Sequence, residues 1–515
     1  MIKFNSKILF CYILFLLVHI GLVWLLPYFP SQDGPSHMYN LLILKDLVNG
    51  GKEWGSIYSY HFRATPNLAF LLISYPLLNL FPALVVEKIF ISIYILLLGG
   101  SVLLFLGTFN EKSLPFIFFV FPVIFSFNLL MGFYSYVITV PFFLIAFSLC
   151  WKIRKQNMTW KFFIFNLSAF VLFYFHLIPF VLFLLSLVFI TGVRTKGINK
   201  NIISQLKLLI LISPSLFILF LHLIKSQGDF PADFSYLFSI PWYLYLFRDL
   251  LTFSSLTLSP WQMIPGFIFS FLFWYFLFAS VFPIFQDRYG KGKKAESIPS
   301  SVKVLIYFSV TLILIYLVAP SRFGGGDFFN QRFPWLILLI LLPILRYDEK
   351  LISKRFVLIS GPSIAAFFLV INIFVFYQEA IKIKQFSNGL NTDLSKGAYV
   401  MIYKRWNPRP HWPRVDVLRH AASYYGIYKG LADIGNYETV FDYFPVKFKD
   451  KTLEFPPIDQ IQYKVETIEW GEYPSIRYIF GWNVENEDTK KLKKYFHVIL
   501  EKHPLSIWER KPVDS

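Results

Sequence analysis

An aspartate stands directly after the first long apolar segment of the chain, in the stretch SQDGPSHMYNLL at residues 31–42. Asp33 is followed by a Gly-Pro pair and, four residues on, by His37. A carboxylate can take the proton of an attacking hydroxyl group or orient that group, and a nearby histidine can position a substrate. At a lipid boundary a carboxylate is costly unless something uses or covers it. In the alternative interpretation the loop simply lies in water.

Basic and imidazole side chains stand near the ends of other apolar segments. The candidates for binding a phosphate group are Arg63, Lys88, Arg322 and Arg332. Two of them flank the triple glycine 324–326, which allows close approach of the backbone to a ligand, and arginine can hold a phosphate through two parallel hydrogen bonds. His176, which interrupts an apolar run, is a further candidate for positioning a donor or acceptor. Each also has a structural interpretation, as a headgroup anchor or a packed histidine.

The composition predicts the environment in which these residues lie. Hydrophobic residues make up 56% of the 515 residues and charged residues only 16%, more apolar surface than a soluble fold of this length buries. The net charge of +18 is carried by short loops between apolar runs, which is typical of cytoplasmic loops facing anionic lipid and not of a nucleic-acid partner. The two cysteines lie in apolar runs, so we expect no structural disulfide. The sequence contains none of the common nucleotide-binding, zinc-protease or serine-hydrolase motifs.

Apolar runs of about 20 residues, the length that spans a bilayer, recur along the first three quarters of the chain. The clear candidates are 8–29, 83–107, 132–151, 202–224, 262–285, 302–319, 332–346 and 355–377, and the run 160–193 is long enough for two helices with a turn near its histidine. Two shorter runs, 66–81 and 115–130, are doubtful.

The basic loops then predict the topology. With the N-terminus in the cytoplasm, the loops 152–161, 194–200, 288–303 and 346–355 are all internal only if one of the doubtful runs spans and the other does not. The result is about eleven transmembrane helices with the C-terminus outside. Charge does not choose between 66–81 and 115–130, although Pro76 and the polar loop before it favour 66–81 as a helix lying in the outer leaflet.

The chain is therefore predicted to be an all-α polytopic membrane protein with a small C-terminal α/β domain outside the cytoplasm. Residues 1–378 form the transmembrane module, with an outer-face loop at 30–65, and residues 379–515 form the soluble domain. In that domain we expect strands at SIRYIFGW (475–482) and in the stretch 496–510, flanking a helix that begins near 486–488.

An acidic residue just past the first membrane helix resembles the signature of the GT-C superfamily of polyprenyl-phosphate-sugar-dependent glycosyltransferases. DGPSHMYNLLILKDL (33–47) is similar to the form of that loop found in many bacterial members. Other stretches also resemble segments of these enzymes: ALVVEKIFISIYILLL, NLLMGFYSYVITVPFFLIAFSL, FHLIPFVLF and GGGDFFNQRFPWLILLILLPIL in the apolar part, and YIFGW, YFHVIL and LSIWER near the C-terminus. These short motifs cover nearly the whole length. One departure is that many members carry an Asp-Glu or Glu-rich pair where this chain has Asp33-Gly34, which leaves open whether a divalent metal is needed.

The resemblance implies transfer of a sugar from a polyprenyl-phosphate donor to a glycan, lipid or protein acceptor on the outer face of the cytoplasmic membrane, with inversion at the anomeric carbon. Asp33 would be the base or would orient the acceptor, His37 and His176 would position substrates, and the four basic residues would stabilise the departing phosphate.

Three other functions fit parts of the same pattern. A glycan ligase or polymerase of the cell envelope would use the same basic face. A transporter or flippase of a lipid-linked substrate would predict ionisable residues deep in several spans and internal repeats, neither of which the sequence shows. A membrane-anchored assembly protein would have no use for Asp33.

Overall fold

The structure is a computed structural model of the 515-residue chain. It describes residues 6–62, 65–193, 198–225, 234, 238–253, 256, 258–289, 298–323, 327–347, 352–403, 414–441, 444–449, 456 and 467–512. Arg63 and the triple glycine 324–326 lie outside the described residues.

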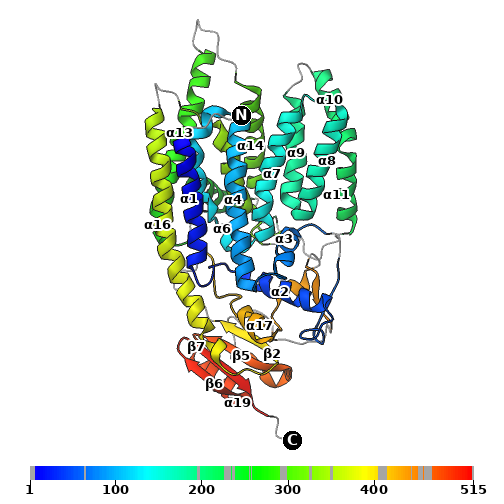
Figure 1. The fold of residues 1–515 in the computed structure, drawn as a ribbon, viewed down its shortest axis with the longest axis vertical. Coiled ribbons are helices and arrows are strands. Elements are labelled where there is room, and N and C mark those ends of the chain that lie inside the picture. The colour runs from blue at the N-terminus through cyan, green and yellow to red at the C-terminus, as the bar shows by residue number, and fades with distance from the viewer. Residues whose placement is uncertain are drawn as a thin grey trace.

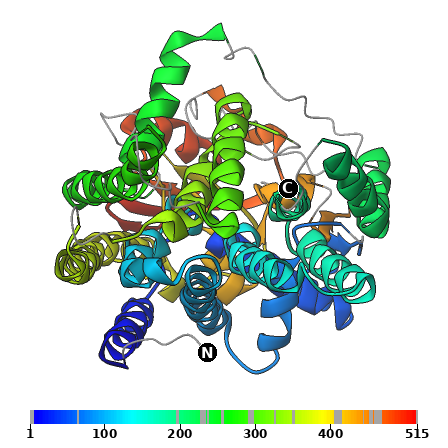
Figure 2. The same ribbon diagram turned by 90° about the horizontal axis from the view of Figure 1, so that it is seen from above.

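Eight helical segments of the described chain are long and apolar enough to cross a membrane. They are α1 (Ser6–Leu25), α4 (Ala83–Phe109), the segment Glu111–Leu130, α7 (Tyr134–Ile153), α8 (Met158–Phe175), the segment Pro260–Phe282 that includes most of α13 (Met263–Tyr289), α14 (Ser300–Val318) and α16 (Lys354–Ser387). They stand side by side as one bundle (Figure 1). Seen from above, α8 and its neighbours in cyan and green gather on one side, and α1, α13 and α16 on another (Figure 2).

Three further apolar segments complete the bundle. Helices α10 (Ile198–Leu211) and α11 (Ser213–Lys225) follow one another with a bend of 68° and together have the length and apolarity of one span. The shorter apolar helices are α9 (Leu177–Gly192) and the segment Asn330–Ile344, which contains α15 (Phe333–Leu341). These three segments stand where the sequence predicted its remaining clear spans, so the polytopic helical class is confirmed.

The two doubtful runs differ in the structure. Residues 66–81 contain only α3 (Ala69–Leu77), nine residues long and too short to span. Residues 111–130 form a segment of span length that is wholly buried within the protein. Its first half is a 3-10 helix, Glu111–Val120, and Pro115 and Pro122 both fall within the segment. Proline cannot donate a backbone hydrogen bond, and irregular backbone at membrane depth is tolerated where protein surrounds it.

The C-terminal part of the chain folds as an α/β domain at one end of the bundle (Figure 1). Its five-stranded sheet has the order β3 (Ala432–Asp433), β2 (Ala398–Tyr403), β5 (Ile476–Trp482), β7 (Leu505–Arg510), β6 (Phe496–Lys502). Strand β2 is parallel to β3 and β5, and β5, β7 and β6 are antiparallel. Helix α19 (Asn486–Tyr495) connects β5 to β6. The predicted strand at 475–482 and helix near 486–488 are confirmed, and the stretch 496–510 forms two strands.

The loop after α1 packs against the C-terminal domain and pairs with it through a short strand. Helix α2 (Gly34–Val48) lies next to α17 (Ser423–Lys429) at the end of the bundle (Figure 1). Strand β1 (Tyr58–Tyr60) pairs antiparallel with β4 (Val446–Phe448). Tyr39 donates to the carbonyl oxygen of Leu431 at 2.9 Å. Helix α16 runs unbroken to Ser387, past the predicted boundary at residue 378, and that division into domains stays a prediction.

The two ends of the bundle are predicted to lie on opposite sides of the membrane. In a protein whose Cys11 and Cys150 are replaced, a cysteine at the exposed Lys155, between α7 and α8, should react with a membrane-impermeant thiol reagent only from the cytoplasm. A cysteine at the exposed Glu487 of α19 should react only from outside. The reason is that basic loops are retained in the cytoplasm. Labelling of both positions from the same side would contradict the eleven-span topology.

Candidate functional site

Asp33 immediately precedes α2, in a chain segment held by the short turn that follows α6 (Phe127–Leu130). The backbone N–H of Gln32 donates to the carbonyl oxygen of Leu130 at 2.8 Å, and that of Asp33 donates to Met131 at 3.2 Å. Aspartate at this position usually accepts a hydrogen bond from the first turn of its helix. The Asp33 side chain makes no such bond, so its carboxylate has another role than capping.

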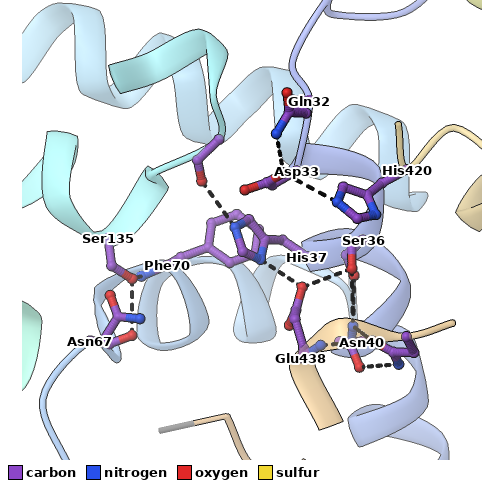
Figure 3. A network of polar contacts seen from close by, with 12 residues as sticks. Gln32, Asp33, Ser36, His37, Asn40, Asn67, Phe70, Ser135, His420 and Glu438 are labelled. Carbon is purple, nitrogen blue, oxygen red and sulfur yellow. Dashed lines mark hydrogen bonds and ion pairs between the residues drawn. The ribbon is translucent and has the colours of Figure 1, made fainter. Parts of the chain in front are cut away.

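The carboxylate of Asp33 instead faces the C-terminal domain. Its Oδ1 accepts a hydrogen bond from Nε2 of Gln32 at 3.2 Å and lies 3.5 Å from Nε2 of His420 (Figure 3). Gln32 also accepts from the backbone N–H of Asp416 at 3.2 Å, which ties this side chain to the same domain. Among the described residues, both of these contacts fall on Oδ1.

Two glycines permit this close packing. Gly132 has φ +90°, and a Cβ there would lie 2.8 Å from Cβ of Asp33. A Cβ on Gly34 would lie 2.3 Å from Oε1 of Glu87 and 2.5 Å from the hydroxyl of Tyr134. A side chain at Gly132 would be strained by the positive φ, and one at Gly34 would have to displace the ends of the Glu87 and Tyr134 side chains. The Gly-Pro turn after Asp33 is therefore explained by the approach of Glu87 and Tyr134 behind it.

Burial changes the protonation of Asp33. The residue is 9% exposed, and burial raises the pKa of its carboxyl from 3.8 to about 6. The positive charge of His37 and the hydrogen bond from Gln32 oppose this shift of the pKa, while Glu438 adds to it. At neutral pH the carboxylate is mostly ionised and is a stronger base than an exposed aspartate, which suits proton transfer.

His37 contacts both the C-terminal domain and the turn after α6. Its Nε2 donates to the carbonyl oxygen of Gly132 at 2.9 Å, and its Nδ1 lies 2.8 Å from Oε1 of Glu438. Ser36 also donates to Glu438, at 3.0 Å. Burial lowers the pKa of His37, but Glu438, Asp33 and the Gly132 carbonyl oxygen act against burial, and together they raise the pKa above its usual value. The result is an imidazolium–carboxylate pair between α2 and the 3-10 helix Tyr437–Val440 (Figure 3).

Three residues near Asp33, namely Glu438, His420 and Arg419, are not among the candidates that the sequence analysis singled out. His37 and Glu438 are 401 residues apart in the chain, and no motif surrounds Glu438. The ring of His420 packs on that of Tyr437 at 4.8 Å. Burial, with Arg419 and His37 nearby, lowers the pKa of His420 to about 3, so this imidazole is neutral at physiological pH.

Glu87 and Lys88 are adjacent in α4 but face different partners. Glu87 is 1% exposed and accepts from Tyr134 at 2.5 Å and from Ser31 at 3.2 Å. Lys88 donates to the carbonyl oxygen of Leu26 at 2.5 Å, at the end of α1. Glu87 therefore supports the turn that carries Asp33, and Lys88 lies beside that turn.

A second cluster joins His176 to Arg332, two of the residues that the sequence singled out. Nη1 of Arg332 lies 3.2 Å from Nε2 of His176. The guanidinium of Arg332 stacks on the rings of Phe133 and Tyr136, at 4.5 and 5.5 Å. Since Phe133 follows Gly132 directly, this cluster and the Asp33 cluster share one turn of the chain.

Arg414, which the sequence did not single out, reaches the first residue of α6, the short helix before that turn. Its guanidinium stacks on Phe127 at 5.0 Å and lies 4.0 Å from Oδ1 of Asp249. Arg322 is elsewhere: its side chain is 74% exposed and forms an ion pair with Asp327 at 2.6 Å. Within the described part of the chain, no group of three or more His, Cys, Asp or Glu side chains is arranged to hold a metal ion.

No family model matches this chain, and no curated protein matches it. Among solved structures, the crystal structure of ArnT from Cupriavidus metallidurans bound to undecaprenyl phosphate is similar over 98% of each chain, with a TM-score of 0.47 and 10% sequence identity. At this score and identity the similarity assigns neither a substrate nor a reaction to the present chain.

Proposed function

We propose that this chain is a membrane glycosyltransferase that moves a sugar from a polyprenyl-phosphate donor to the hydroxyl group of an acceptor on the outer face of the cytoplasmic membrane. The observation that carries this proposal is Asp33, a buried carboxylate that does not cap its helix and has its described contacts on one oxygen only. It lies where the first membrane helix ends, which is the level at which a lipid phosphate would present its sugar.

The reaction is a single displacement. The acceptor oxygen attacks the anomeric carbon as the bond from that carbon to the phosphate oxygen breaks, the acceptor proton passes to Asp33, and the polyprenyl phosphate leaves. One displacement inverts the anomeric centre, so no second carboxylate nucleophile is needed.

Asp33 is a better candidate for the base than either neighbouring histidine. His420 has a pKa lowered to about 3 and binds a proton more weakly than Asp33, whose pKa is about 6. Both ring nitrogens of His37 are already engaged, Nδ1 with Glu438 and Nε2 with the Gly132 carbonyl oxygen, so neither is free to take the acceptor proton. If Asp33 only orients the acceptor hydroxyl, its placement supports that role equally.

Arg332 is the leading candidate to stabilise the departing phosphate. It stands at the start of the apolar α15, so that its guanidinium would lie at the level of a lipid headgroup, and it shares the turn at Gly132 with Asp33. Arg63, Lys88 and Arg322 stay candidates for the same role, and His176 and His37 for positioning the donor or acceptor.

The test is reconstitution of the purified chain in liposomes with polyprenyl-phosphate sugars and a panel of glycan, lipid and protein acceptors. We expect release of free polyprenyl phosphate together with a new glycosidic bond, both followed by mass spectrometry. Transfer of whole glycans in blocks would favour a ligase or polymerase. Movement of the intact lipid-linked sugar across the bilayer without release of polyprenyl phosphate would favour a flippase and contradict the proposal.

A further inference from the structure

The C-terminal domain places one carboxylate into the site of the membrane domain. Glu438 is 2% exposed and lies in the 3-10 helix Tyr437–Val440, yet the side chains that it contacts, Ser36 and His37, belong to α2. A buried carboxylate is costly unless it is paired and hydrogen-bonded. The pairing with His37 offsets this cost and places an ion pair one helical turn from Asp33.

We propose that Glu438 is a positioning residue of the site, which acts through His37 to hold the Gly132 turn against Asp33 and to keep a positive charge next to the Asp33 carboxylate. The C-terminal domain thereby sets the reactive state of a base that belongs to the membrane domain. This inference deepens the proposed function and rests on it.

The geometry supports the positional part. His37 follows Asp33 by one helical turn, and its backbone N–H donates to the Asp33 carbonyl oxygen at 3.0 Å. The His37 ring lies between Glu438 and the Gly132 turn. Its Nδ1 is 2.8 Å from Oε1 of Glu438, and its Nε2 is 2.9 Å from the carbonyl oxygen of Gly132. A carbonyl oxygen only accepts hydrogen bonds, so Nε2 must carry a proton, and Glu438 draws a second proton to Nδ1. Figure 3 shows these side chains converging below Asp33.

The charges near Asp33 support the electrostatic part. The charged or titratable groups that act on it are His37 from α2, His420 and Arg419 from the segment before α17, and Glu438, with Glu87 behind Gly34. His37 lowers the pKa of Asp33 more than Glu438 raises it. Removal of Glu438 would remove the largest of the influences that raise the pKa of His37, while burial would still lower it, so His37 would hold its positive charge less well. The positive charge nearest Asp33 would then be weaker, and the pKa of Asp33 would rise.

A purely structural role for Glu438 makes a different prediction. The same two elements, α2 and the 3-10 helix Tyr437–Val440, are also joined by Asn40 and Asn436, whose side-chain amides exchange hydrogen bonds of 3.0 and 2.8 Å. This pair carries no charge. Asn40→Ala is therefore a matched control that weakens the docking of the C-terminal domain without changing the charge beside Asp33.

The experiment compares Glu438→Gln, Glu438→Asp and Asn40→Ala in the full chain in liposomes, with two measurements against pH. One is the rate of sugar transfer, whose acidic limb reports protonation of the base. The other is the infrared carboxyl band of Asp33, identified by its loss in Asp33→Asn. We expect Glu438→Gln to move both midpoints upward by roughly one pH unit, which lowers transfer about tenfold on the acidic side. Glu438→Asp, which keeps the negative charge, should move the midpoints by less than Glu438→Gln does. Asn40→Ala should lower thermal stability without moving either midpoint.

An unchanged midpoint in folded Glu438→Gln, or an equal shift in Asn40→Ala, would overturn the inference. If Glu438→Gln does not fold, His37→Gln carries the same test, since it removes the positive charge directly and keeps a donor to the Gly132 carbonyl. The infrared measurement does not need turnover. A shifted infrared midpoint in a protein that transfers no sugar would reject the proposed function and leave the coupling of Glu438 to Asp33 in place.

Discussion

Asp33→Asn should leave the protein folded and inserted and should lower sugar transfer by roughly 10²- to 10⁴-fold, the usual cost of losing a general base. Asparagine keeps the size of the side chain, and its Oδ1 can still accept from Gln32. Close packing against Gly132 is also unchanged. What is lost is the ability to take a proton. Initial rates of transfer at matched protein levels in liposomes measure the effect.

The control for this substitution is Asp393→Asn, at an exposed carboxylate outside the site. It should leave both transfer and thermal stability as in the wild type. If Asp33→Asn transfers sugar at the wild-type rate, Asp33 is not the base, and the proposed mechanism fails. If instead it only raises the concentration of acceptor needed for half-maximal rate, Asp33 orients the acceptor and another group takes the proton.

Arg332→Lys should keep the protein folded and lower transfer by about 10- to 100-fold. A hydrogen bond to a charged group contributes about 1.5–3 kcal/mol, and each 1.4 kcal/mol corresponds to about a factor of ten in rate. Lysine keeps the charge but loses the planar guanidinium that stacks on Phe133 and approaches His176 and that could grip a phosphate through two parallel bonds. Arg332→Ala should be more severe. Rates are measured at saturating and at limiting donor.

Two results would separate phosphate binding from simple anchoring. Higher acceptor concentrations should rescue neither variant, because the defect lies with the donor. Arg477→Lys, at a half-exposed arginine on β5 paired with Glu509, should transfer sugar as the wild type does. Equal activity of Arg332→Lys and wild type under both donor conditions would exclude the bidentate role, since lysine anchors at a headgroup as well as arginine does.

The sequence by itself determined the helical membrane class and the positions of the crossing segments. A bilayer requires a continuous apolar run of fixed length with its backbone satisfied internally, and this constraint is local. The same holds for the strand at 475–482 and for helix α19, whose start near 486–488 was correctly predicted. Asp33 could be proposed as a candidate for a similar reason, because an acidic residue at the end of an apolar run stands out without any knowledge of its neighbours.

The sequence determined less about residues that act in pairs. It singled out His176 and Arg332 as separate candidates, and the contact of 3.2 Å between their side chains is visible only in the structure. It grouped Arg322 with them, but this side chain is exposed and paired with Asp327. A basic residue near the end of a helix has the same local pattern whether it faces a substrate or the solvent. Only the surroundings of the side chain in the folded protein distinguish the two.

The tertiary structure alone decided what surrounds Asp33. Glu438, His420 and Arg419 lie in a polar stretch that resembles any exposed surface, and they reach the site because β4 pairs with β1 and α17 packs against α2. The reason for a glycine at position 132 is likewise visible only in the structure, where its φ is positive and Asp33 packs closely against it. The pKa of Asp33 likewise depends on burial by groups distant in the chain. The length of an apolar run is a local property of the sequence, whereas the burial and charge pairing of a side chain depend on contacts between distant segments.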